Sequence, residues 1–222
     1  MTILSPSVIR IERPISECAR ILNNLGCQSV HIDICQGLAF PGFFNLDEIQ
    51  PNSLSAFNAC VTMHLFWLAG DRRAGLSLLR KTDLAVLHVF PNTAADDISN
   101  FLEEVSLVGC RSGLSLDLKI DPSMIELYLP ILDTIFVMGI PVATYGLQPD
   151  QSTLNRITSV DLMIDKCNPQ CRLGLDGGIN ATTFPQLVNL VDELVLGSLL
   201  FHTNDIIAQW MTLNLYAKGE TK

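Results

Sequence analysis

Four side chains of the types that bind metal ions stand near the ends of three short apolar runs. His31 and Asp33 are two residues apart in the first run, so both side chains point to the same face of a strand. His64 lies near the end of the second run, and Asp176 directly follows the third. Two imidazoles and two carboxylates that converge would suit a divalent cation such as Zn²⁺, Fe²⁺ or Mn²⁺.

Each of these residues also has a simpler interpretation when it is taken alone. A single histidine at a strand end is more often a buried core or rim group than a metal ligand. Asp176 could instead cap a helix that follows it. A buried aspartate at such a position needs a partner that offsets its desolvation, and a metal ion would supply one. The metal site is therefore a prediction about the four residues together.

Short β-branched runs alternate with longer helical stretches along the chain, which is the pattern of β/α units around a parallel sheet. The run over 84–89 is continuously apolar, as expected for a strand buried on both faces. Eight strands and about eight crossovers match a closed (β/α)8 barrel, an α/β fold whose catalytic groups lie at the carboxyl ends of its strands. The predicted strands begin at Ile3-Leu4 and continue at 29–34, 60–65, 84–89, 113–118, 134–138, 172–175 and 193–196.

Helices are predicted between these strands. Pro14 opens the first helix and Gly26 ends it, because proline favours the first turn and glycine the position after the last. A polar, Asn-rich stretch before residue 58 leaves room only for a short helix. The remaining helices are predicted over 71–80, 94–109 and about 121–130, between 150 and 172, after residue 180, and from residue 203 onward.

Length and composition limit the classes of protein. The 222 residues, 48% of them apolar, favour a single barrel domain over 1–222. The net charge of −9 disfavours nucleic acid and anionic membranes as partners, and no apolar run reaches the ~20 residues of a membrane span. A small anionic substrate stays compatible, since backbone N–H groups can bind a phosphate without an excess of Lys or Arg.

The seven cysteines are an odd set, and the first residues lack the long apolar core of a signal peptide. We therefore expect reduced thiols and a cytoplasmic protein. Cys167 and Cys171 could be half of a metal site, but no second pair stands at a suitable spacing, so they are interpreted as ordinary thiols.

Several motifs resemble those of the ribulose-phosphate 3-epimerase family and its allulose-phosphate relatives. Their order and spacing fit from residue 3 to about residue 201, which is nearly the whole chain. They include the family's H-x-D strand, its next strand with a metal-binding histidine, its D-G-G-I turn, its P-S opening and its closing G-S turn. The matching segments are S-V-H-I-D-I (29–34), M-H-L (63–65), D-G-G-I (176–179), S-P-S (5–7) and L-V-L-G-S (194–198) with Phe201.

The resemblance implies a metal-dependent epimerase that acts at carbon 3 of a ketose phosphate such as ribulose 5-phosphate. It implies one divalent metal per chain, bound by His31, Asp33, His64 and Asp176. Asp33 and Asp176 would also act as acid and base, because inversion removes a proton from one face and returns one to the other. The metal would stabilise an enediolate. By analogy with the family, a homo-oligomer is expected. Substrate contacts are implied for Ser7, Met138, Gly177, Gly178, Gly197 and Ser198, the last four through backbone N–H groups on the phosphate.

The sequence departs from the family where the substrate would be recognised. Cys35-Gln36-Gly37 replaces M-D-G, so one carboxylate is absent, and Phe66 replaces a methionine. His88 matches a family histidine and is interpreted as a rim or core residue, while Phe90 replaces the acidic residue expected two positions later. The segment P-V-A-T-Y-G-L-Q (141–148) replaces a glycine-rich phosphate loop, and we expect it to make different backbone turns and to contribute little to phosphate binding.

These departures fall on substrate recognition and spare the four predicted metal ligands, so an epimerase with an altered phosphosugar substrate is the leading hypothesis. The alternative is a barrel that keeps the metal but has a binding or regulatory role without turnover. A third hypothesis is a different phosphate-binding barrel enzyme in which Asp176 acts without a metal. The fold alone does not decide between them, because this barrel supports many chemistries.

Overall fold

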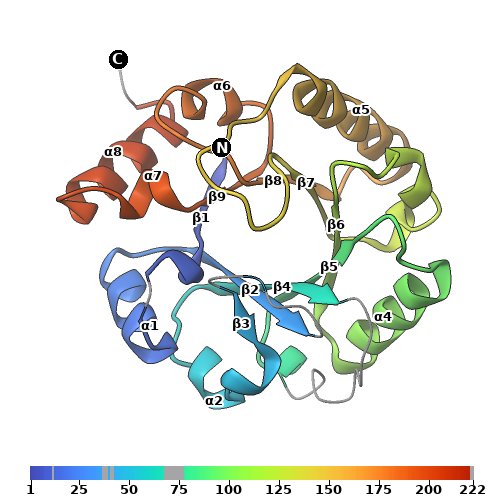
Figure 1. Cartoon of the computed structure of the whole chain (residues 1–222), viewed down its shortest axis with the longest axis horizontal. Helices are drawn as coiled ribbons and strands as arrows, with labels where there is room; N and C mark the ends of the chain where they lie inside the picture. Colours follow the sequence, from blue (N-terminus) through green and yellow to red (C-terminus); the bar gives the residue numbers. More distant parts are fainter. Residues whose placement is uncertain (12, 37–39, 41–42, 68–77, 221–222) are drawn as a thin grey trace.

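The chain forms a ring of parallel strands with helices on its outside (Figure 1). The computed structural model describes residues 1–11, 13–36, 40, 43–67 and 78–220. The strands in these residues are β1 (Ile3–Pro6), β2 (Ser29–Gln36), β3 (Phe44–Asn45), β4 (Cys60–Trp67), β5 (Leu84–Val89), β6 (Arg111–Leu116), β7 (Thr134–Met138), β8 (Arg172–Asp176) and β9 (Glu193–Leu196). They make one sheet in the order β1-β9-β8-β7-β6-β5-β4-β2-β3.

Eight of these strands make up the barrel, and β3 is an addition. The ring closes between β1 and β2, where Ser7 and His31 form a parallel bridge and the hydroxyls of Ser5 and Ser29 are 2.9 Å apart. The two-residue β3 pairs with β2 only at Ile34↔Phe44 and the next pair. The predicted (β/α)8 barrel is therefore confirmed. The sequence did not predict β3, since two residues are too few to show a periodic pattern.

Most strand boundaries agree with the sequence, and β6 is the main exception. It was predicted over 113–118, but its pairing with β5 runs from Leu84↔Arg111 to Val89↔Leu116. The strand is therefore displaced by two residues towards its amino end, and Asp117 follows it directly at the rim. This places Asp117 at the mouth of the barrel, where catalytic groups of such barrels lie.

The helices occupy the outside of the ring (Figure 1). Those within the described residues are α1 (Ile15–Asn24), α2 (Pro51–Leu54), α4 (Ala95–Val108), α5 (Gln151–Cys167), α6 (Phe184–Leu187), α7 (Ser198–Phe201) and α8 (Ile206–Ala217). The 3₁₀ turns are η1 (Val8–Arg10), η2 (Leu46–Glu48), η3 (Pro122–Ile125) and η4 (Leu129–Ile131). The short α2 agrees with the expectation for the Asn-rich stretch. The helix predicted over 71–80 lies almost wholly outside the described residues.

The helix predicted over about 121–130 is wrong. Two separate turns, η3 and η4, replace it. Asp121 caps only the first, accepting a hydrogen bond from the Ser123 N–H at 2.9 Å. Pro130 cannot donate a backbone hydrogen bond and would clash with the preceding turn of a continuous α-helix, so it lies at the start of the second turn.

The inside of the barrel is packed differently from the layer between the sheet and the helices. A small apolar cluster inside it contains Leu84, Val86, Phe136 and Val195, whereas the main core lies outside the sheet. Gly174 on β8 makes room for Phe136, because a Cβ atom there would lie 2.4 Å from its ring. Phe136 in turn packs edge-on against the His31 ring, with centroids 5.5 Å apart. The barrel interior thus supports a functional side chain from below.

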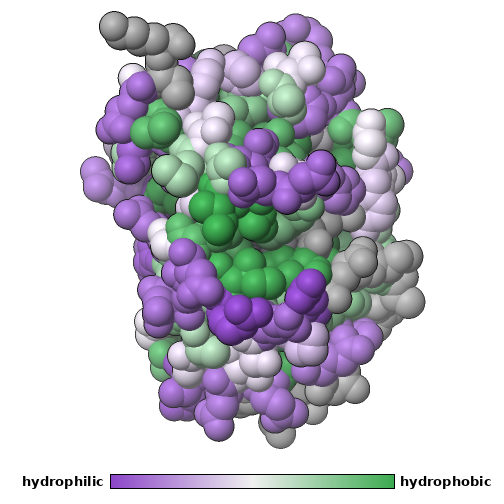
Figure 2. All heavy atoms as spheres, turned by 90° about the vertical axis from the view of Figure 1, so that its left-hand side faces the viewer, coloured by the Kyte–Doolittle hydropathy of each residue, from purple (hydrophilic) through white to green (hydrophobic). Residues whose placement is uncertain are grey.

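One side of the molecule exposes apolar atoms. Figure 2 shows the face over α1, α7 and α8, where apolar side chains gather in a band between polar rims. On α8, Ile207, Met211 and Leu215 are 61%, 59% and 41% exposed. Within the described ranges, no helix has both the length and the hydropathy needed to cross a membrane.

Candidate metal centre and active site

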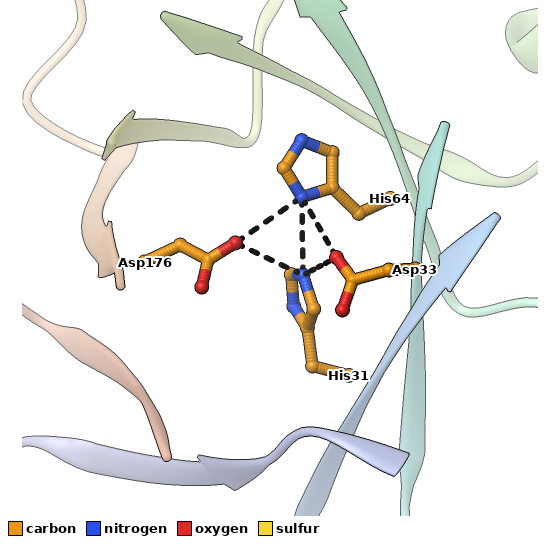
Figure 3. A group of neighbouring side chains, drawn as sticks. All are labelled: His31, Asp33, His64 and Asp176. Carbon is orange, nitrogen blue, oxygen red and sulfur yellow. Dashed lines mark hydrogen bonds and ion pairs between the residues drawn. The ribbon is translucent and has the colours of Figure 1, made fainter. Parts of the chain in front are cut away.

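Four side chains converge at the carboxyl end of the barrel (Figure 3). They are the predicted set, His31 and Asp33 from β2, His64 from β4 and Asp176 from β8. The strand pairing explains the convergence, because Asp33 lies directly opposite His64 in the β2–β4 register. His31 and His64 are fully buried, and the Asp33 residue is 4% exposed.

The distances within this cluster are those of ligands around one ion. Nε2 of His31 and Nδ1 of His64 are 3.2 Å apart. Each of these nitrogens is 3.4 Å from Oδ1 of Asp33, and they are 3.7 and 3.4 Å from Oδ2 of Asp176. A tetrahedral ion with ligand bonds of about 2.1 Å has ligand–ligand edges of about 3.4 Å. The four residues therefore fit a divalent metal in both donor type and spacing.

The electrostatics of the cluster also favour a positive charge at its centre. Burial opposes the charged form of His31, but the carboxylates of Asp33, Asp176 and Glu193 outweigh it and raise its pKa to about 9. Burial likewise opposes ionisation of Asp33, yet His31 and His64 hold the pKa of that carboxyl well below its usual range. A cation, either a proton on His31 or a metal, is needed to hold the two carboxylates together.

Ser7 stands beside the cluster, whereas the family resemblance implied a contact with the substrate. Its hydroxyl donates to Oδ2 of Asp33 at 3.2 Å, the oxygen that faces away from the two imidazoles. Ser7 also lines the cavity above the cluster. It can therefore orient the Asp33 carboxylate and still face a bound molecule.

A cavity of about 390 Å³ opens over the cluster. Every predicted catalytic or substrate-binding residue lies on its wall, while the two buried histidines lie beneath. No Lys or Arg is found among the described residues that line it, but His202, which the sequence analysis did not single out, does line it. The predicted residues on the wall are Ser7, Asp33, Met138, Asp176, Gly177, Gly178, Gly197 and Ser198.

The loop that follows β7 forms another part of this wall. Residues 140–147 line the cavity, and Ala143 adopts a left-handed backbone with φ of 57°, which non-glycine residues rarely do. The loop packs closely on the D-G-G turn, since a Cβ atom on Gly178 would lie 2.7 Å from Pro149 Cδ and 2.8 Å from Ile140 Cγ2. The loop thus shapes the cavity despite its few glycines.

Two further polar residues continue the site away from the cavity. Nδ1 of His88 on β5 lies 3.4 Å from Nε2 of His64, and Oδ2 of Asp117 lies 3.7 Å from Nε2 of His88. Sequence analysis interpreted His88 as a rim or core residue and missed Asp117. The signal was present, because Ser115 and Asp117 alternate at a strand end as His31 and Asp33 do.

The fold and the site together define a class, a (β/α)8 barrel with a possible metal centre at the carboxyl ends of its strands. Residues 2–201 match the ribulose-phosphate 3 epimerase family, and the chain belongs to this family. The family resemblance and the assignment to the carbohydrate epimerases predicted from the sequence are therefore confirmed.

Relatives share this family at low identity. A ribulose-phosphate 3-epimerase from Aquifex aeolicus is 23% identical over 211 residues, covering 94% of each chain. One from Escherichia coli K12 is 23% identical over 189 residues, covering 81% of this chain and 80% of its own.

Solved structures of other proteins share the fold of this chain at low sequence identity, so they support the fold and nothing further. A 3-hexulose-6-phosphate synthase from Salmonella typhimurium has a TM-score of 0.68 at 16% identity, over the full length of both chains. KGPDC from Streptococcus mutans has a TM-score of 0.69 at 9% identity, covering 99% of this chain and 98% of its own.

Proposed function

We propose that this protein is a metal-dependent epimerase that inverts carbon 3 of a ketose phosphate, such as ribulose 5-phosphate or a related phosphosugar. The observation that carries the proposal is the cluster of two imidazoles and two carboxylates beneath a cavity, with ligand atoms within 4.8 Å of one another. Membership of the epimerase family supports the same reaction.

His31, Asp33, His64 and Asp176 would hold one divalent ion of zinc, iron or manganese. When bound, that ion would polarise the ketone and stabilise the negative charge of the enediolate. The two buried histidines would act only as metal ligands in this reaction. The two carboxylates remain partly open to the cavity, so they can bind and also exchange protons with a substrate.

Asp33 and Asp176 would act as the two proton-transfer groups. They lie on opposite sides of the imidazole pair (Figure 3), on strands separated by β1 and β9. A sugar bound between them would present one face of carbon 3 to each carboxylate. One carboxylate would remove the proton, the other, protonated, would return a proton to the opposite face, and the roles would exchange in the reverse reaction.

The phosphate of the substrate would be bound by backbone N–H groups at Gly177, Gly178, Gly197 and Ser198. These turns follow β8 and β9, which in such barrels commonly form the phosphate site. The absence of Lys and Arg from the described cavity wall supports binding by backbone groups. Ser7 and Met138 would contact the rest of the sugar.

The test is proton exchange at carbon 3 in deuterated water, followed by NMR with ketopentose and ketohexose phosphates. We expect the wild-type protein to incorporate deuterium and to produce both epimers. Asp33→Asn and Asp176→Asn should each abolish epimerisation, with exchange from a single face surviving in one of them at most. Asp165→Asn, on the exposed side of α5, is the matched control and should behave as the wild type.

Three results would overturn this assignment. A metal-loaded protein that exchanges no carbon-bound proton in any ketose phosphate would favour the alternative, a barrel with a binding or regulatory role. Exchange that survives the double substitution of Asp33 and Asp176 would assign the chemistry to other residues. A protein that turns over without metal would favour the third hypothesis, a different phosphate-binding barrel enzyme in which Asp176 acts without a metal.

The homo-oligomer expected from the family is supported by the exposed apolar residues of α8, because such surfaces often mark association sites. The cytoplasmic location stays a prediction from the sequence.

A further inference from the structure

Three side chains form a line that leads from the metal cluster into the barrel wall. They are His64 on β4, His88 on β5 and Asp117 directly after β6. Both histidines are fully buried, and the Asp117 side chain is 17% exposed. The contacts along the line are 3.4 Å from His64 to His88 and 3.7 Å from His88 to Asp117.

The position of the ring nitrogens determines where the protons must lie along this line. Nδ1 of His64 is the atom that faces the cluster, so a metal requires its lone pair there and the proton on Nε2. Among the described residues, Nδ1 of His88 is the atom in reach of that N–H, at 3.4 Å, so it must be the acceptor. The proton of a neutral His88 is thereby forced onto its Nε2.

Nε2 of His88 is a buried atom that has no hydrogen-bond partner among the described residues. A buried N–H of this kind destabilises the fold if it stays unpaired. Oδ2 of Asp117 lies 3.7 Å away, a few tenths of an ångström beyond a formed hydrogen bond. The pKa of Asp117 is held below its usual value by His88, so the carboxylate is an ionised acceptor.

Phe66 holds both imidazoles in place. Its ring stacks on His88 with a centroid distance of 4.7 Å and an angle of 25°, and it lies 4.1 Å from the His64 ring. This packing keeps the two imidazoles from turning. Nε2 of His64 therefore stays directed at Nδ1 of His88.

We infer that His88 and Asp117 are positioning residues of the metal centre, which fix the tautomer and the orientation of His64 so that its Nδ1 is free to bind the ion. The inference rests on the metal-binding part of the proposed function and not on the reaction. Mutation of a carboxylate that orients a metal-binding histidine typically lowers metal affinity or activity by about 10- to 100-fold. Here a second histidine transmits that effect.

The test compares substitutions that remove a hydrogen-bonding atom with substitutions that keep one. His88→Phe removes the acceptor but keeps a flat ring against Phe66, whereas His88→Gln offers an amide oxygen. Asp117→Leu removes the acceptor for His88, whereas Asp117→Asn keeps an oxygen of the same reach. Asp165→Leu on α5 is the control for an acidic residue replaced by leucine.

Zn²⁺ affinity, measured by chelator competition at fixed pH, and ¹⁵N shifts of the His64 ring are the readouts. We expect His88→Phe to weaken Zn²⁺ binding about 10- to 100-fold and Asp117→Leu about tenfold, while Asp117→Asn, His88→Gln and the control stay within a few-fold of wild type. The double variant His88→Phe/Asp117→Leu should bind Zn²⁺ no more weakly than His88→Phe alone, because both changes act through the same contact of His88 with His64. In Asp117→Leu, the ¹⁵N shifts should show His64 losing its single tautomer.

Wild-type affinity in a folded His88→Phe protein would overturn the inference. So would equal losses in Asp117→Leu and Asp117→Asn with an unchanged His64 tautomer, because a merely structural role predicts that pattern. If His88→Phe does not fold, the Asp117 pair decides the question. A protein that keeps the predicted Zn²⁺ effects but exchanges no proton in a ketose phosphate would overturn the proposed reaction and leave this inference standing.

Discussion

The cavity has two walls of different construction. The wall that holds the cluster is built from the ends of β2, β4 and β8, and its two histidines are fully buried. The wall formed by the loop after β7 is irregular and open, with Tyr145 and Leu147 47% and 52% exposed. Regular strands thus position the groups proposed for the chemistry, whereas the loop shapes the space in which a substrate would lie.

Because of this difference, we expect substitutions in the two walls to affect different binding steps. Changes in the strand wall act on charges that are buried and mutually dependent, so each should have a large effect on metal binding. Changes in the loop wall act on packing near solvent and should alter substrate binding more than metal binding. Substitutions in each wall can therefore be compared by the same two measurements, metal affinity and the KM for substrate.

The largest effect is expected for His64→Ala. Structural metal sites of four ligands are stabilised by roughly 10–16 kcal/mol, so loss of one ligand should cost roughly 4 kcal/mol, about a thousandfold in affinity. We expect about one metal per wild-type chain and most of it absent from the variant, as measured by elemental analysis. Full occupancy in a protein that lacks both His31 and His64 would show that the strand wall is not the metal site.

The next effect concerns the charge of the strand wall in metal-free protein. The pKa of His31 is raised to about 9 from 6.5, so the stability it contributes is complete below pH 6.5 and is lost as pH rises towards 9. The free energy of unfolding should fall over that window by no more than about 3 kcal/mol. Denaturant titrations between pH 6 and 9.5, with a chelator present to keep the protein metal-free, measure this free energy.

His31→Asn is the matched variant for this titration and should remove most of the slope. The same proton must leave when a metal binds, so calorimetry in buffers of different ionisation enthalpy should show about one proton released per metal at pH 7. A flat stability profile in metal-free wild-type protein would mean that the carboxylates of the cluster do not hold a proton on His31.

The strand wall was predictable from the sequence and the loop wall was not. His31 and Asp33 share a face because side chains alternate along a strand, and parallel strands bring their carboxyl ends to one rim. These rules hold whatever the neighbouring residues are. Asp117 follows the same rule but was missed, because β6 ends two residues earlier than the pattern indicated.

No comparable rule predicts the conformation of the loop after β7 from its sequence. Its shape depends on contacts with a turn about 30 to 40 residues later in the chain, such as those of Ile140 and Pro149 with Gly178. The left-handed conformation of Ala143 is likewise imposed by its surroundings, since its residue type favours another. The helix predicted over about 121–130 failed for a local reason that the sequence did contain, the missing N–H of Pro130.

The smallest effect is expected for Gly178→Ala, which tests the contact between the loop wall and the D-G-G turn. Gly178 has a φ of 74° and its added Cβ atom would lie 2.7 Å from Pro149 Cδ. Gly109→Ala is a closely matched control, because its φ is 75° and nothing lies within 4 Å of the added atom. Both variants carry the cost of a left-handed alanine, roughly 1–2 kcal/mol in the free energy of unfolding.

Only Gly178→Ala must also displace the loop, so the difference between the two variants isolates that contact. We expect Gly178→Ala to be less stable than Gly109→Ala by about 1 kcal/mol, the lower end of the cost of overpacking. It should also raise the KM for a ketose phosphate several-fold while Zn²⁺ affinity stays at the wild-type value. A loss of Zn²⁺ affinity in Gly178→Ala would show that the two walls are coupled, because Gly178 lies only two residues after Asp176.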